Sequence, residues 1–136
     1  MSQHNLETRL HYLESCEAIR SLVGRYATAA DQRNNPAIMQ HLFHDDAVWC
    51  ANGFGEYQGR QNILDALSGI AEAQVLWSLH IMAMPDIEVL DHHANVSWML
   101  WEVCKLAEKG MQATTSCLGG FYQATVRCDE EDDWKF

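Results

Sequence analysis

The stretch V-L-W-S-L-H-I-M-A-M-P-D-I-E-V-L-D, residues 75–91, decides the fold, because it is the longest strand-like run in the chain. After Pro85 it alternates as a half-buried strand does, with Ile87 and Val89 on one face and acidic residues on the other. Before Pro85 both faces are largely apolar: Trp77, Leu79 and Ile81 form one, and Ser78, His80, Met82 and Met84 form the other. Such a strand is covered on both sides or lines a dry pocket.

His80 is the titratable side chain within this apolar half of the strand. An imidazole that faces such a space is either a hydrogen-bonded core histidine or a catalytic group, because buried polar groups need partners and histidine changes charge near neutral pH. Taken alone, the strand favours the core interpretation.

Helices precede the long strands. Apolar residues at helical spacing predict a helix over 14–30, with Tyr26 inside the apolar stripe and Asp31 at the helix end. Asn35 and Pro36 predict the start of a short second helix. A strand at 47–50, a helix at 60–72, strands at 94–108 and 111–127 and a last strand from Trp134 complete the series. This order predicts an α+β fold, a cone-like roll in which a curved antiparallel sheet packs on three N-terminal helices.

The composition limits the partners and the compartment. The 136 residues predict a single domain, 1–136, with residues 1–13 as an N-terminal extension, and the net charge of −10 disfavours nucleic acids and anionic membranes. The five cysteines are scattered and odd in number, which is typical of reduced thiols. The sequence begins without a signal peptide, and no run reaches the ~18 apolar residues of a membrane span. We therefore expect a cytoplasmic protein.

The sequence offers no recognisable cofactor motif. The glycine-rich stretch at 52–59 lacks both common phosphate-binding signatures, and it also carries Phe54 and Tyr57. His41, His44, Asp45 and Asp46 are metal-ligand types without metal-site spacing, so a polar helix end and turn explain them better. Gly119 and Gly120, inside a predicted strand, indicate a bulge or a sharp bend. We expect neither a metal nor an organic cofactor.

Several motifs in a fixed order resemble one known family. They are I-R-S-L-V-G-R-Y-A-T-A-A-D at 19–31, H-L-F-H-D-D-A-V-W at 41–49, Y-x-G-R-x-x-I at 57–63, W-x-x-H at 77–80, I-E-V-L-D at 87–91 and W-K-F at 134–136. Together they resemble the SnoaL-like proteins of the nuclear transport factor 2-like superfamily, over nearly the whole chain from about Glu14. The family includes polyketide cyclases, scytalone dehydratase, bile-acid dehydratase, ketosteroid isomerases and the β subunits of ring-hydroxylating dioxygenases, so the fold alone does not choose a function.

The resemblance implies a catalytic site. In the dehydratase branch, a tyrosine and an aspartate of the first helix meet a histidine on the strand after the third helix, and Tyr26, Asp31 and His80 stand at matching places. Their spacing resembles that of bile-acid dehydratase most closely, whereas the second histidine of scytalone dehydratase has no counterpart at 94–127. His80 would then act as general base and acid, Asp31 would orient the imidazole, and Tyr26 would donate to a substrate carbonyl.

The expected ligand is a small hydrophobic molecule with a carbonyl group, such as a steroid or polyketide, that undergoes dehydration, isomerisation or cyclisation. Strand alternation suggests as pocket-lining candidates Trp49, Phe54, Tyr57, Met82, Met84, Trp98, Leu118 and Tyr122. Apolar surface on a bent sheet also predicts self-association as a dimer or trimer. The alternative is a non-catalytic ligand-binding module or a structural β-type subunit of a ring-hydroxylating dioxygenase.

Overall fold

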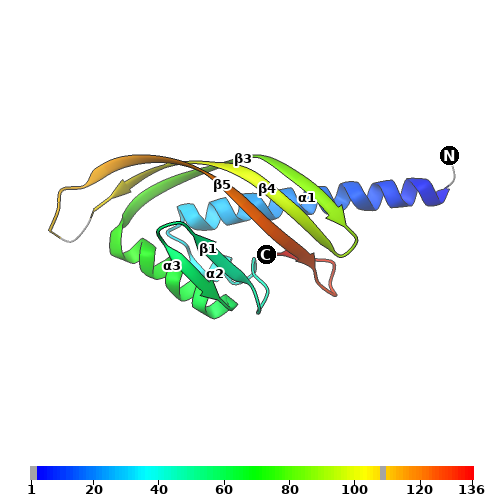
Figure 1. Ribbon diagram of the computed structural model, residues 1–136, viewed down its shortest axis with the longest axis horizontal. Helices are drawn as coiled ribbons and strands as arrows, with labels where there is room; N and C mark the ends of the chain where they lie inside the picture. The colour runs from blue at the N-terminus through cyan, green and yellow to red at the C-terminus, as the bar shows by residue number, and fades with distance from the viewer. Residues whose placement is uncertain (1–2, 108–109) are drawn as a thin grey trace.

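Three helices and a small hairpin precede a run of long strands (Figure 1). The computed structural model describes residues 3–107 and 110–136. In chain order the elements are α1 (Gln3–Asp31), α2 (Pro36–Met39), β1 (Val48–Ala51), β2 (Gly55–Gln58), α3 (Arg60–Gln74), β3 (Val75–Leu90), β4 (His93–Leu106), β5 (Thr114–Cys128) and β6 (Trp134–Lys135). The expected end of the β4 strand at Glu108 lies outside the described residues.

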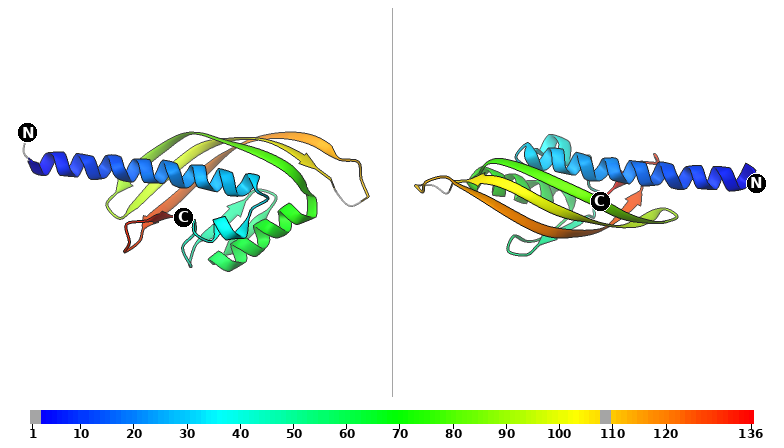
Figure 2. Two further views of the ribbon diagram at one scale, coloured as in Figure 1. Left: turned by 180° about the vertical axis from the view of Figure 1, so that it is seen from behind. Right: turned by 90° about the horizontal axis from the view of Figure 1, so that it is seen from above.

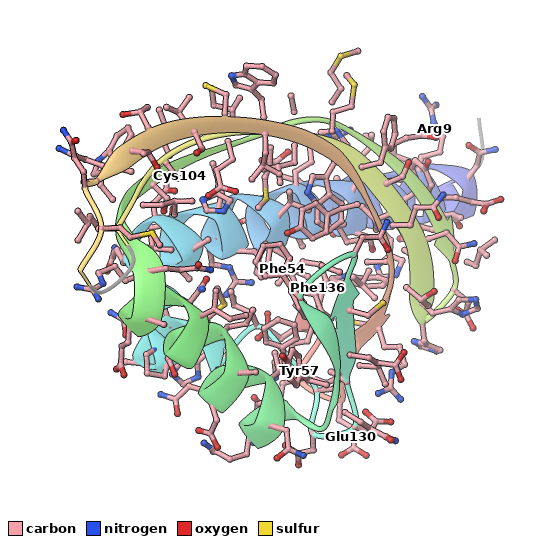
Figure 3. All side chains as sticks on the ribbon, turned by 60° about the vertical axis from the view of Figure 1, so that its left-hand side comes forward. Arg9, Phe54, Tyr57, Cys104, Glu130 and Phe136 are labelled. Carbon is pink, nitrogen blue, oxygen red and sulfur yellow. The ribbon has the colours of Figure 1, made fainter. Side chains whose placement is uncertain are left out.

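The long strands form one curved antiparallel sheet in the order β3-β4-β5-β6, while β1 and β2 pair separately as a two-stranded sheet. Figure 3 shows α1, α3 and the β1–β2 hairpin together on the concave side of the curved sheet. The predicted α+β fold is therefore confirmed. One side of the sheet faces the helices, and no described helix or strand covers the other side (Figure 3).

Helix α1 supplies much of the core. Ile19, Leu22 and Val23 are buried together with Tyr26, which confirms the predicted apolar stripe. The helix starts at Gln3, well before the predicted start at residue 14. The additional turns run past the end of the sheet (Figure 2), and Leu6, Leu10 and Leu13 are exposed there. No helix within the described ranges combines the length and apolarity needed to cross a bilayer.

Local signals explain the next segment. The Asn35 side chain accepts a hydrogen bond from the Ala37 N–H at 3.0 Å, with Pro36 in the first helical position, as predicted. The glycine-rich stretch contains a second strand, β2, that the sequence did not predict. Positive φ angles of 84° at Gly53 and 98° at Gly55 form the tight turn that leads into β2, whose first residue is Gly55.

A bulge in β3 reverses the faces of the sheet on which the following side chains lie. The pairing of β3 with β4 shifts between Ala83 and Asp86, and Met84 has a φ of 53°. Met84 is consequently 76% exposed. The prediction that it shares the inner face with His80 and lines a pocket is wrong, because an inserted residue reverses strand alternation.

The paired glycines of β5 form no bulge. Gly119 and Gly120 pair with Trp101 and Leu100 in a register that continues without a shift along β5, so of the two predicted alternatives, a bulge or a bend, the bulge is wrong. A Cβ atom on Gly119 would lie 3.4 Å from the Trp101 indole ring. Glycine at this position therefore leaves room for a large side chain on the neighbouring strand.

Candidate active site

The end of α1 meets the inner face of β3 through Asp31 and His80. The Asp31 Oδ1 atom accepts a hydrogen bond from the backbone N–H of His80 at 2.8 Å and lies 2.7 Å from the His80 Nδ1 atom. The β3 strand presents His80 toward the helices together with buried Ser78, whereas Trp77 and Leu79 are exposed on the outer face. Two residues far apart in sequence are thus joined by two short contacts.

These contacts define the role of each imidazole nitrogen. A carboxylate accepts hydrogen bonds, so Nδ1 must carry a proton to donate to Asp31. In the neutral ring, Nε2 then holds the free lone pair and is the atom able to take up a proton. The arrangement is that of a histidine oriented by a carboxylate, the combination that general acid–base catalysis uses.

A second carboxylate lies on the opposite side of the ring. Glu102 of β4 pairs directly with His80 across the strands, and its Oε2 atom lies 3.5 Å from His80 Nε2. The side chains of His80 and Glu102 are each 14% exposed, and that of Asp31 is 26% exposed. The sequence reasoning missed Glu102. The signal was present, because continuing the alternation from Trp98 and Leu100 places Glu102 on the same inner face.

Tyr26 lies in an aromatic cluster on the same side of the sheet. Its hydroxyl accepts a hydrogen bond from Trp49 Nε1 at 2.9 Å, and its ring meets those of Phe43, Tyr122 and Phe136 edge-on. Burial is the main reason that the pKa of Tyr26 lies well above its ordinary value. The phenol therefore stays protonated at neutral pH and is suited to donate a hydrogen bond rather than to act as a base.

A pocket of about 380 Å³ opens beside this cluster, between β1 and β5. Its lining includes Tyr26 and three of the predicted ligand-contacting residues, Trp49, Trp98 and Tyr122. Asp31 and His80 are not part of this lining. The Glu102 charge adds to the burial that raises the pKa of both Tyr26 and Tyr122, so the carboxylate lies within electrostatic reach of the two phenols. Along β4, Trp98 lines the pocket and Glu102 pairs with His80, so the pocket and the His80 site lie on the same inner side of the sheet.

The remaining predicted ligand contacts do not line this pocket. Tyr57 stacks on Trp49 with ring centroids 6.1 Å apart and donates its hydroxyl proton to the Phe54 carbonyl at 2.7 Å. Figure 3 shows Phe54 and Tyr57 on the concave side of the sheet. Met82 packs against the core, and Leu118, which is 40% exposed, pairs with Glu102.

Trp98 and Tyr122 both line the pocket, and their rings are stacked. Their rings stack with centroids 5.0 Å apart and an interplanar angle of 7°. The Trp98 Nε1 atom is buried, and no protein atom among the described residues accepts its hydrogen bond. Such an orphaned buried donor is uncommon in a folded protein.

The outer face carries a separate polar depression of about 420 Å³, lined by side chains that include Asp86, Glu88 and Gln123. None of the predicted site residues lines it, so its larger volume does not make it the better candidate. Within residues 3–107 and 110–136, no group of three histidine, cysteine or acidic side chains is placed to hold a metal ion.

The helices and the curved antiparallel sheet have the fold of nuclear transport factor 2-like proteins. A protein of this superfamily from Salmonella enterica superposes with a TM-score of 0.81 at 15% identity, over 91% of this chain and 87% of that one. The model of the SnoaL-like domain matches residues 11–136, and the chain belongs to this family.

Two further solved structures share the fold. The hexachlorocyclohexane dehydrochlorinase LinA-type3 from Novosphingobium barchaimii has a TM-score of 0.81 at 22% identity, over 94% of this chain and 85% of that one. A candidate scytalone dehydratase from Novosphingobium aromaticivorans has a TM-score of 0.78 at 21% identity, over 92% and 80% of the two chains. No curated protein matches the sequence.

Proposed function

We propose that this protein is a lyase or isomerase that acts on a hydrophobic, carbonyl-bearing ring compound by acid–base catalysis without a cofactor. The observation that carries the proposal is the 2.7 Å contact between Asp31 Oδ1 and His80 Nδ1 in a largely enclosed site. Both ring nitrogens of His80 face carboxylates, Asp31 at 2.7 Å and Glu102 at 3.5 Å. An enclosed imidazole oriented by a carboxylate is the arrangement expected of a general acid or base.

In the proposed reaction, His80 Nε2 removes a proton from the carbon next to the substrate carbonyl. The C–H electron pair moves into an enolate, whose oxygen is stabilised by a tyrosine hydroxyl at the pocket. The imidazolium then returns the proton to a hydroxyl group on the neighbouring carbon, so that the C–O bond breaks and water leaves. In an isomerisation the same proton would return to another carbon instead. Asp31 holds the ring throughout and stabilises its positive charge.

Glu102 would stabilise the same imidazolium from the other side, because Nε2–H then points toward a carboxylate. Replacing Glu102 with glutamine keeps the shape but removes the charge, so we expect kcat to fall about tenfold, the loss of one charge-assisted hydrogen bond. The measurement is steady-state turnover, with Glu88→Gln as the control since Glu88 is exposed on the outer face. An unchanged kcat in Glu102→Gln would remove Glu102 from the mechanism. A higher kcat would show that its carboxylate obstructs Nε2.

The relatives support an elimination. One structural neighbour is named a dehydrochlorinase and another a candidate scytalone dehydratase, and loss of HCl or of water each begins or ends with a proton transfer. The spacing of Tyr26, Asp31 and His80 resembles bile-acid dehydratase most closely among the family patterns. These likenesses favour dehydration of a ring ketone as the first reaction to test.

Deuterium exchange tests the proposal with any carbonyl compound that enters the pocket. Cyclic ketones and β-hydroxy ketones are incubated with the protein in D₂O, and mass spectrometry measures deuterium at the carbon next to the carbonyl. We expect incorporation above the buffer rate for compounds that fit the pocket, together with enone formation from the hydroxy ketones. Compounds that bind but neither exchange nor eliminate would make the protein a binding module.

A second candidate function is assembly, with or without catalysis. The uncovered face of the sheet carries large apolar side chains that are 41–75% exposed: Trp77, Leu79, Ile81, Met99, Trp101 and Phe121. Apolar patches of this kind mark interfaces. A structural subunit of an oxygenase or a self-associating enzyme would both cover this face.

Replacing Trp101 with glutamate tests the assembly. We expect the dissociation constant of a self-associated form to rise at least tenfold, because an aromatic anchor is replaced by a charge that has no partner there. Sedimentation velocity over a range of concentrations measures the change. Ser21→Glu, on an exposed part of α1, is the control. A wild-type protein that stays monomeric at all concentrations would contradict self-association through this face.

A further inference from the structure

The Tyr26 hydroxyl is held by a side chain of the β1–β2 hairpin. Trp49 Nε1 donates a hydrogen bond to the Tyr26 oxygen at 2.9 Å. Both side chains belong to the lining of the pocket of about 380 Å³. Because Tyr26 is only 5% exposed, few other groups can reach its oxygen. The indole of Trp49 is thus a defined partner of the phenol at the wall of the pocket.

Neighbouring contacts hold the Trp49 indole in place. Trp49 pairs with Tyr57 across the hairpin, and the two rings stack with an interplanar angle of 27°. Tyr57 in turn donates its hydroxyl proton to the Phe54 carbonyl at 2.7 Å. A stacked ring on a paired strand has little freedom to turn, so the indole N–H keeps its direction. The hairpin therefore presents a fixed donor to a residue of α1.

The bond from Trp49 restricts where the Tyr26 proton can point. An oxygen that accepts one hydrogen bond must direct its own proton elsewhere, so this proton is left for an acceptor on a different side of the oxygen. The bond also affects acidity. Burial is the main reason that the pKa of Tyr26 is raised, and the hydrogen bond from Trp49 lowers this pKa. A donor that withdraws electron density from the oxygen also strengthens the O–H as a donor.

We propose that Trp49 is a positioning residue, whose indole N–H directs the Tyr26 hydroxyl proton toward the carbonyl oxygen of a ligand in this pocket. The inference rests on the proposed function, in which a tyrosine hydroxyl stabilises the enolate oxygen. Strand alternation predicts Trp49 only as apolar lining of the pocket. The hydrogen bond gives it a second role, in which it acts on the ligand through Tyr26.

Trp98 offers a matched comparison in the same pocket. It also belongs to the lining, but no protein atom in residues 3–107 and 110–136 accepts its Nε1 proton. Replacing either tryptophan with phenylalanine removes an indole N–H and keeps an aromatic ring for stacking. Trp49→Phe breaks the bond to Tyr26, whereas Trp98→Phe leaves that bond intact. The difference between the two variants therefore isolates the effect of this bond.

The binding test compares a ketone, 1-tetralone, with tetralin, the same ring system without the carbonyl. Calorimetry measures both affinities for wild type and for the variants. Tyr26→Phe should lower the preference for the ketone about tenfold, the effect of losing one hydrogen bond. Trp49→Phe should lower it about threefold, because the donor remains but its direction is no longer fixed. Trp98→Phe should change the affinity for both probes by the same factor.

The double variant with Trp49→Phe and Tyr26→Phe shows whether Trp49 acts through Tyr26. Its preference for the ketone should equal that of Tyr26→Phe alone, because the phenol that Trp49 positions is already missing. A further fall in the double variant would overturn the proposal. A wild-type protein that binds both probes equally would also overturn it. So would a loss of preference in Trp98→Phe but not in Trp49→Phe, since the donor would then be the Trp98 indole.

NMR of the indole N–H groups follows the bond itself, with Trp49→Phe identifying the signal. In the wild type, 1-tetralone should move the Trp49 Nε1 proton further downfield than tetralin does, since a phenol that donates to a carbonyl becomes a better acceptor. A residue with a purely structural role would respond equally to both probes, which would contradict the proposal. In Tyr26→Phe the difference between the probes should vanish, and a difference that persists there would also contradict it.

These measurements need no turnover, so their failure is distinguishable from failure of the proposed function. A ketone preference that depends on Trp49 and Tyr26, without deuterium exchange in any ketone, would support the positioning role within a binding module. Exchange at the wild-type rate in both Trp49→Phe and Tyr26→Phe would preserve the enzyme and reject this pair as the source of the donor.

Discussion

Replacing His80 with glutamine is expected to lower kcat/KM by about 10²- to 10⁴-fold, the contribution of one general acid–base group. In the wild type, Asp31 Oδ1 lies 2.7 Å from His80 Nδ1, and a glutamine amide at residue 80 can still donate to this oxygen. The amide nitrogen, however, has no lone pair that could take up a proton. Since the backbone N–H of residue 80 also keeps its bond to Asp31, the strand should stay in place. The loss would therefore fall on the chemical step.

The measurement is the initial rate of enone formation or of deuterium exchange, with the thermal midpoint recorded for each variant. His92→Gln is the matched control, because the His92 side chain is 86% exposed in the turn after β3. Equal rates in wild type and His80→Gln would remove His80 from the mechanism. A shared fall in both histidine variants would indicate a general effect on the protein rather than on the site.

Replacing Asp31 with asparagine is expected to lower kcat by about 10²-fold. In a serine protease the same exchange at the orienting aspartate costs far more, because the imidazole adopts the wrong tautomer. Here the backbone N–H of His80 also donates to Asp31 Oδ1, and this second bond holds the asparagine oxygen toward the histidine. His80 should therefore keep its proton on Nδ1, and the fall in kcat would reflect the missing negative charge beside the imidazolium.

Asp65→Asn is the control, because Asp65 is an exposed carboxylate that accepts a hydrogen bond from Gln61 on α3. Turnover and substrate affinity are measured separately, and the fall should appear in kcat with KM little changed. A variant that loses affinity but keeps kcat would place Asp31 in binding. Full activity in Asp31→Asn would show that the contact with His80 is structural.

Much of the fold could be predicted from hydrophobic periodicity. The 3.6-residue stripe of α1 and the two-residue alternation of β4 each identified the side that faces the core, and Val96, Trp98 and Leu100 are all buried there. The start of α1 was not predictable in this way. Its first turns place their leucines in solvent beyond the sheet, so no buried stripe marks them.

The errors on the strands have one physical origin. Alternation assigns faces correctly until an extra residue is inserted, and the sequence does not say on which side of Pro85 the bulge occurs. Met84, with its positive φ, is where it falls. Gly119 and Gly120 suggested a bulge or a bend, yet they stay in register, and the missing side chain of Gly119 leaves room for Trp101.

The site was predictable as a set of residues but not as an arrangement. Asp31 and His80 were named from separate elements, and the docking of α1 on β3 brings them into contact. Glu102 and the link between Trp49 and Tyr26 depend on cross-strand register and on the position of the hairpin. Neither can be read from local spacing, since the partners come from elements whose relative placement is set by the whole core.

One oxygen atom of Asp31 accepts bonds from both the backbone and the side chain of a single residue on β3. Sliding β3 along the helix by one residue would break both bonds at once, so the site has no half-assembled form. The contact between Asp31 and His80 thus also joins the first helix to the first long strand of the sheet. Activity and the native fold should accordingly disappear at the same denaturant concentration, which makes turnover a direct report on how much of the chain is folded.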